Sequence, residues 1–129
     1  MAATSLVLFR GFQDEVGEKL LRTIHKDIPE LSIETFLTIE ALIQWLRYRE
    51  GGKRAVVLLV PATDDQLHKM IPFINLLEDL RVLLVLPNHE THTIGCGYKF
   101  KPSFLMFRDE DSRNLSLVLS KIVSNGPAK

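Results

Sequence analysis

Apolar residues in this chain form two kinds of pattern, short continuous runs and stripes with helical spacing. The continuous runs are residues 6–9, 55–60 and 82–86, and the run 55–60 is rich in valine. Continuous runs of this length predict strands that are buried on both faces of a parallel sheet. Residues 31–36 alternate instead, with Leu31, Ile33 and Thr35 on one face, which predicts a half-buried edge strand. Residues 103–107 predict a fifth strand.

Between the strands, apolar residues recur at the spacing of an amphipathic helix. The predicted helices run from Asp14 to Pro29, from Thr38 to Gly51-Gly52, from Thr63 to Leu77, and from Asp111 or Ser112 to about residue 123. Thr38 is expected to cap the second helix, and Thr63 with Gln66 has the form of a capping box. Pro72 should kink or split the third helix. Residues 89–102 contain two glycines and one proline, so a fourth helix there is expected to be short or irregular.

Strands and helices therefore alternate, which calls for right-handed βαβ units. The most apolar strands, 55–60 and 82–86, should be central together with 6–9, and the other two should form the edges. This predicts a flavodoxin-like α/β sandwich of three layers, with a five-stranded parallel sheet in the order 2-1-3-4-5. At 129 residues, one domain over 1–129 with an ordered core at about 5–124 is expected.

Composition narrows the classes of function. Sixteen basic and sixteen acidic residues cancel, so the formal charge gives no case for nucleic acid or an anionic membrane as a partner. The cations near residues 47–54 are interpreted as a solvated helix end. The one cysteine, Cys96, excludes an intrachain disulfide. No signal peptide or membrane span is evident, so a cytoplasmic location is expected.

One local motif points to a family. Glu40-Ala41-Leu42 opens the second predicted helix, and a Val-Val-Leu-Leu strand follows after a short loop. With the order of elements, this resembles the receiver domain of bacterial two-component response regulators, a CheY-like fold, over roughly residues 5–124. The resemblance implies a signalling module, in which an aspartate after the third strand accepts a phosphoryl group beside a bound Mg²⁺.

Other residue types occupy the positions to which the resemblance assigns this chemistry. The phosphoacceptor position falls on Val60, and the acidic pair that would hold Mg²⁺ falls near Arg10 and Gly11. The hydroxyl position falls on Pro87, and the lysine position falls near Arg108. Valine cannot accept a phosphoryl group and arginine cannot ligate Mg²⁺. The sequence thus resembles a degenerate receiver, or pseudo-receiver, with no enzymatic activity, no cofactor and no resident metal.

Such a module is expected to act by binding a protein partner in a bacterial signalling pathway, and self-association into a homodimer stays open. Receiver domains commonly dock through the face formed by the fourth helix, fifth strand and fifth helix. The apolar residues expected there are Tyr98, Phe100, Phe104 and Phe107. Trp45, at the margin of the apolar stripe of the second helix, is either an edge-of-core residue or a second contact.

The alternative function is that of a small ligand- or metal-binding α/β protein. His89, His92 and Cys96 have ligand chemistry and would reach one zinc ion from a helical segment. The acidic pairs Asp14-Glu15 and Asp64-Asp65 follow the first and third strands and offer a displaced cation site. The competing interpretation is that each acidic pair stabilises a helix N-terminus.

Overall fold

Five parallel strands form a single twisted sheet in the computed structural model, which describes residues 5–11, 15–49 and 55–125. The strands lie in the order β2-β1-β3-β4-β5, and every neighbouring pair is parallel. Their bounds are β1 Ser5–Arg10, β2 Ser32–Phe36, β3 Ala55–Val60, β4 Arg81–Leu86 and β5 Phe104–Phe107. The predicted flavodoxin-like fold and its strand order are confirmed.

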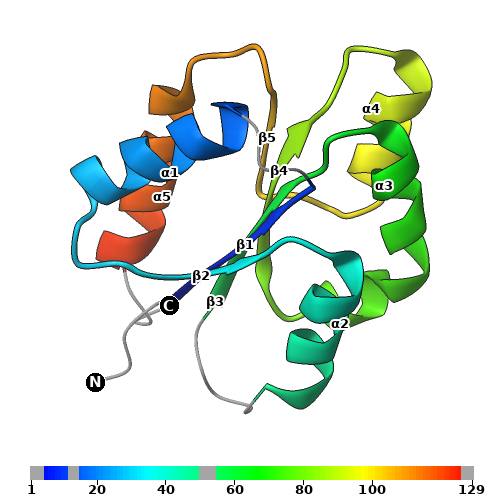
Figure 1. The fold of residues 1–129 in the computed structure, drawn as a ribbon, viewed down its shortest axis with the longest axis horizontal. Coiled ribbons are helices and arrows are strands. Elements are labelled where there is room, and N and C mark those ends of the chain that lie inside the picture. Colours follow the sequence, from blue (N-terminus) through cyan, green and yellow to red (C-terminus); the bar gives the residue numbers. More distant parts are fainter. Residues whose placement is uncertain (1–4, 12–14, 50–54, 126–129) are drawn as a thin grey trace.

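Helices cover both faces of this sheet. Figure 1 shows α1 and α5 on one face, and α2, α3 and α4 on the other. Their bounds are α1 Glu15–Asp27, α2 Ile39–Tyr48, α3 Asp64–Met70, α4 Thr91–Tyr98 and α5 Ser112–Asn125, with a 3₁₀-helix, η1, at Ile71–Leu77. Of the helices that the structure describes, none has both the length and the apolar character needed to cross a membrane.

The predicted start and stop signals account for most helix boundaries. The Thr38 hydroxyl accepts the Ala41 N–H at 3.1 Å and caps α2, whereas Gly51-Gly52, the predicted end of that helix, lies outside the described residues. The third helix is split as Pro72 predicts, because α3 ends at Met70 and continues as η1. The fourth helix is short, as expected.

The edge strand β2 departs from prediction at one position. Leu31 is buried just before it and Ile33 is partly buried, but Thr35 is exposed. The interpretation of Thr35 as part of a buried face is therefore wrong. A threonine hydroxyl needs no apolar cover, and β2 pairs with β1 alone.

Strand alternation divides the core into two clusters. Leu6, Leu8 and Val60 belong to the cluster under α1 and α5, whereas Val7 and Phe9 belong to the cluster under α2, α3 and α4. Because side chains two residues apart share a face, Arg10 lies on the α1 face of the sheet with Leu6 and Leu8. The register pairs Arg10 with Val60, so these two residues end adjacent strands side by side.

Candidate functional site at the carboxyl end of the sheet

The carboxyl ends of β1, β3 and β4 form the edge where parallel α/β sheets bind ligands. At the end of β3, Val60 is 4% exposed and belongs to the apolar core, and Pro61 after it is buried. Pro87, after β4, is partly buried. The side chains of these three residues offer neither a nucleophile nor a metal ligand at the ends of the two central strands.

Arg10, at the end of β1, lies inside the protein. It is 5% exposed, and its Nη1 donates to Glu18 Oε2 in α1 at 3.2 Å. Its guanidinium lies against Gly17, where an added Cβ would be 2.8 Å from the Arg10 Nε. A glycine inside a helix costs about 1 kcal/mol relative to alanine, and here it provides room for the guanidinium. A positive charge therefore occupies the region where the resemblance implied a pair of acids.

Gln66, in the first turns of α3, links the loops that follow β1 and β3. Its Oε1 accepts the Ala62 N–H at 2.8 Å, and its Nε2 donates to the Gly11 carbonyl at 3.4 Å. A Cβ on Gly11 would collide with this side-chain amide and would lie 2.7 Å from the Ala62 nitrogen. Gly11 is thus required by close approach, and the two loops are held together by a neutral side chain.

The capping box predicted at the start of α3 is half formed. The Thr63 hydroxyl accepts the Gln66 N–H at 3.2 Å, which is the expected cap. The Gln66 side chain reaches the N–H of Ala62, one residue before Thr63, rather than that of Thr63 itself. Its second bond, to Gly11, draws the amide towards β1.

Asp64, the first residue of α3, is tied to α4. The Nε2–H of His92 donates to its carboxylate at 2.8 Å, and the Nδ1–H of His68 donates to its backbone carbonyl at 2.9 Å. The hydrogen bond from His92 holds the pKa of Asp64 below its usual value. Glu90 Oε1 lies 3.4 Å from the same nitrogen of His92. This polar cluster joins the N-terminal ends of α3 and α4 at the surface.

The structure does not bring His89, His92 and Cys96 together. The His89 ring stacks on Phe107 at 3.8 Å between centroids, and its Nε2 bonds to Asp109 at 3.0 Å. His92 points to α3, as described above. Cys96 is 4% exposed in the core, and burial raises the pKa of its thiol. The interpretation of these three residues as one zinc site is therefore wrong.

The acidic pairs also form no cation site in the described part of the chain. Asp64 is occupied by His92, and Asp65 pairs with Lys69 at 3.5 Å one helical turn along α3. Glu15 is exposed in the first turn of α1, and Asp14 lies outside the described residues. Across the described residues, no three histidine, cysteine or acidic side chains gather in a way that could hold a metal ion.

The predicted contact residues separate into surface and core positions. Tyr98, at the end of α4, is 63% exposed, and Phe104 and Phe107 on β5 are partly buried. Phe100 is 3% exposed and lies in the core, so the interpretation of Phe100 as a contact residue is wrong. Because α4 is short, the chain turns back to the sheet directly after it and carries Phe100 inward. Trp45 is partly buried and lies 6.4 Å from Phe36, between ring centroids.

The cations near the end of α2 are engaged with the protein itself. Arg49 binds both carboxylate oxygens of Asp79 at 2.7 Å. Arg47 lies over the Phe73 ring, 5.8 Å from its centroid. Lys53 and Arg54 lie outside the described residues. The two described arginines thus make contacts within the protein, as expected for cations at a helix end.

Two residues of the site, Gln66 and Gly17, were missed as site residues by the sequence analysis. The sequence indicates Gln66 only as a helix cap, because its bond to Gly11 spans 55 positions of sequence. Gly17 carried a signal, since an isolated glycine in a helical pattern often marks close packing. Its partner Arg10 could not be inferred from that signal.

The doubly wound topology and the strand-end site define the class as a flavodoxin-like α/β domain. No family model matches the chain, and no curated protein sequence matches it. The solved structures that are similar over most of its length include these two. One is the signal receiver domain of an HD domain-containing protein from Pseudomonas fluorescens Pf-5, with a TM-score of 0.66 and 13% identity over 100% of both chains.

The other is a response regulator protein from Burkholderia pseudomallei with a phosphorylated aspartic acid, calcium ion and citrate. It has a TM-score of 0.57 and 10% identity, and the match covers 97% of this chain and 75% of that one. Within the flavodoxin-like class, the fold of this chain is therefore that of a signal receiver domain.

Proposed function

We propose that this protein is a phosphorylation-independent, non-enzymatic receiver-type module that signals by binding another protein. The observation that carries the proposal is the pairing of Arg10 with Val60 at the ends of β1 and β3. Likeness to receiver structures from Pseudomonas fluorescens and Burkholderia pseudomallei supports a signalling role in a bacterial cytoplasm.

Phosphoryl transfer depends on a nucleophile and on neutralisation of charge by Mg²⁺. Val60 supplies no nucleophilic oxygen. Mg²⁺ requires oxygen ligands, and the buried guanidinium of Arg10 would repel it. Gln66 already joins the two loops that a phosphoryl group and a metal would otherwise connect. These contacts favour one constant conformation of the site.

The proposed contact surface is the one formed by α4, β5 and α5. Tyr98 of α4 and Leu117 of α5 are two of the most exposed large apolar side chains in the described residues, at 63% and 67%. Phe104 adds partly exposed aromatic surface on the edge strand β5. Exposed aromatic side chains are enriched at protein interfaces, but α2 carries one too, Tyr48. We favour the α4, β5 and α5 surface because receiver domains commonly dock through this face.

Treatment with acetyl phosphate or beryllofluoride and Mg²⁺ tests the first half of the proposal. Two-dimensional NMR spectra should show no specific shifts of the Gly11, Val60 or Gln66 amides. A receiver domain that retains its aspartate serves as a positive control for the reagents. Saturable shifts centred on these amides, or a mass increase of one phosphoryl group, would show that the module is switched by phosphorylation.

A matched pair of tyrosine variants tests the second half. After cross-linking in the source cell identifies a partner, its affinity is measured with purified proteins. Tyr98→Ala should weaken binding about tenfold or more, as expected for an aromatic interface residue. Tyr48→Ala, on α2 and 78% exposed, is the control and should leave affinity unchanged. The opposite result would move the contact surface to α2 and Trp45. Analytical ultracentrifugation of the free protein then tests whether the partner is a second copy.

A further inference from the structure

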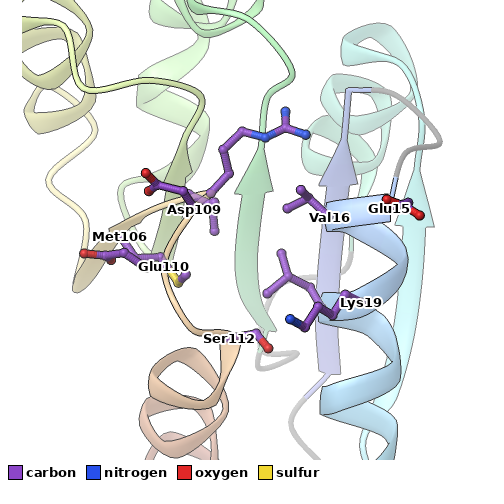
Figure 2. Close-up of a pocket in the computed structure, with 10 residues that line it drawn as sticks. Glu15, Val16, Lys19, Met106, Asp109, Glu110 and Ser112 are labelled. Atoms are coloured by element: carbon purple, nitrogen blue, oxygen red, sulfur yellow. The ribbon is translucent and has the colours of Figure 1, made fainter.

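A cavity of about 250 Å³ lies between the first turns of α1 and the loop that follows β5. Its floor is apolar, made by Leu20 of α1, Val85 of β4 and Met106 of β5, each no more than 2% exposed. Val16 forms one wall (Figure 2). Pockets for drug-sized ligands usually measure about 300–1,000 Å³, so an occupant here would be small.

One cation faces this cavity without a close counter-ion. Lys19 lines it, and in the described residues no carboxylate lies within ion-pair distance of its ammonium group. Figure 2 shows the Lys19 ammonium on the side of α1 that faces Ser112. Ser112 is the first residue of α5, where the helix dipole adds a positive field. Arg108 also lines this cavity, but it is engaged by other groups of the protein, so Lys19 is the cation on which the binding depends.

The carboxylates near the cavity point away from Lys19 or are bound by other groups of the protein. Asp109 accepts a hydrogen bond from His89, and Glu110 Oε1 accepts the Phe107 N–H at 3.2 Å. Figure 2 shows both carboxylates pointing away from α1, and Glu15 pointing away from the loop. The remaining acid, Asp111, is held by Arg113, with a weaker influence of Lys19 that also lowers its pKa.

We propose that this cavity binds a small monocarboxylate, with its carboxylate at Lys19 and its short apolar body over Leu20, Val85 and Met106. The apolar floor disfavours a ligand that is charged throughout, because burying polar groups without partners is costly. The nearby acids disfavour a dianion such as phosphate, since each additional negative charge adds repulsion. The inference stands apart from the proposed signalling function, because it uses neither Val60 nor Gln66.

Titration with hexanoate, followed by NMR of the Met106 methyl group and the Lys19 and Ser112 amides, tests the assignment. Saturable shifts at all three are expected. Hexanamide, which keeps the chain and removes the charge, should bind at least about fivefold more weakly, the effect of losing one ion pair. Inorganic phosphate should cause no shifts at the Met106 methyl group.

Two variants of α1 complete the test. Lys19→Gln should weaken hexanoate binding about fivefold, whereas Lys26→Gln, at the far end of α1, should not change it. Circular dichroism establishes that both variants are folded. The proposal is overturned if hexanoate causes no saturable shifts, if hexanamide binds equally well, if phosphate binds in its place, or if Lys19→Gln binds like Lys26→Gln.

Discussion

Gln66 links the loops at the carboxyl ends of β1 and β3, and its removal tests directly whether this link stabilises the protein. Gln66→Ala deletes both bonds that join the loops after β1 and β3, and leaves the Thr63 cap of α3 in place. We expect this substitution to lower the free energy of unfolding more than the same substitution of an exposed glutamine would. We also expect the loss to be accompanied by local opening at the Ala62 amide, because its N–H would lose the Gln66 Oε1 acceptor.

The magnitude follows from the two hydrogen bonds. The bond from the Ala62 N–H to Gln66 Oε1 is 2.8 Å long and contributes about 1 kcal/mol. The bond to the Gly11 carbonyl is 3.4 Å long, near the upper limit, and contributes a few tenths of a kcal/mol. Together with the cost of leaving a partly buried N–H unpaired, we expect a decrease of about 1–2 kcal/mol in the free energy of unfolding.

Gln44→Ala is the matched control, because Gln44 is exposed on α2 and the same change in helix propensity applies to it. Urea unfolding can be followed through the fluorescence of Trp45, the only tryptophan in the chain. Hydrogen exchange should accelerate at the Ala62 amide in Gln66→Ala and stay unchanged there in Gln44→Ala. A structural role for Gln66 is refuted if the two variants differ in free energy of unfolding by less than about 0.3 kcal/mol, the scatter between unrelated positions, or if exchange at Ala62 is unchanged.

Three further outcomes are expected. Lys101 has a left-handed backbone with φ of 51°, so Lys101→Gly should stabilise the protein by about 0.5–1 kcal/mol, measured by urea unfolding. The Thr93 hydroxyl is fully buried and has no hydrogen-bond partner in the described residues, so Thr93→Val should stabilise by about 1 kcal/mol in the same assay. The pKa of Asp64 is lowered from 3.8 chiefly by the His92 hydrogen bond, so its contribution to stability is present above that pH and is lost as pH falls through the lowered pKa. His92→Ala should raise the Asp64 pKa towards 3.8, as measured by carboxyl NMR titration.

Each outcome has a control in a neighbouring or similar residue. Lys99→Gly, where φ is −63°, should not stabilise. Thr91→Val replaces an exposed hydroxyl and should change stability by less than about 0.5 kcal/mol. The pKa of Asp111, which Arg113 lowers to about 2, should be unaffected by His92→Ala. A gain in stability with Lys99→Gly or Thr91→Val would show that backbone strain and the buried hydroxyl are not the causes.

The fold was predictable because each element carries its own signal. Residues 55–60 and 82–86 are continuously apolar, and both lie in the centre of the sheet. Thr38 and Pro72 mark a helix start and a helix break through local chemistry alone. One exception besides Thr35 is Phe100, whose burial depends on where a short helix ends and on how the chain returns to β5, through the left-handed Lys101. The path of this loop is set by the tertiary structure, and no periodic pattern of apolar residues in the sequence predicts it.

For the strand-end site, the sequence predicted positions but not contacts. Val60 and Pro87 could be located by counting along predicted strands, and the structure places both at strand ends. What replaces the missing groups depends on pairs of residues that are distant in sequence or lie on different elements. Arg10 packs on Gly17 of α1, and Gln66 reaches Gly11 across 55 positions. No spacing rule links such pairs before the fold is known.

These contacts change the meaning of the missing carboxylates. Removing acidic groups from a receiver site would leave two loops without the metal that usually joins them, and a polar site without charge balance. Here the Arg10 charge is paired with Glu18, and the loops are joined by a neutral amide. Because these contacts are made between residues of the chain itself, the Arg10 charge is paired and the two loops are linked without a ligand. Under the proposed function, phosphate and Mg²⁺ are therefore expected to leave the conformational equilibrium unchanged, since a ligand shifts only an equilibrium whose states it binds differently.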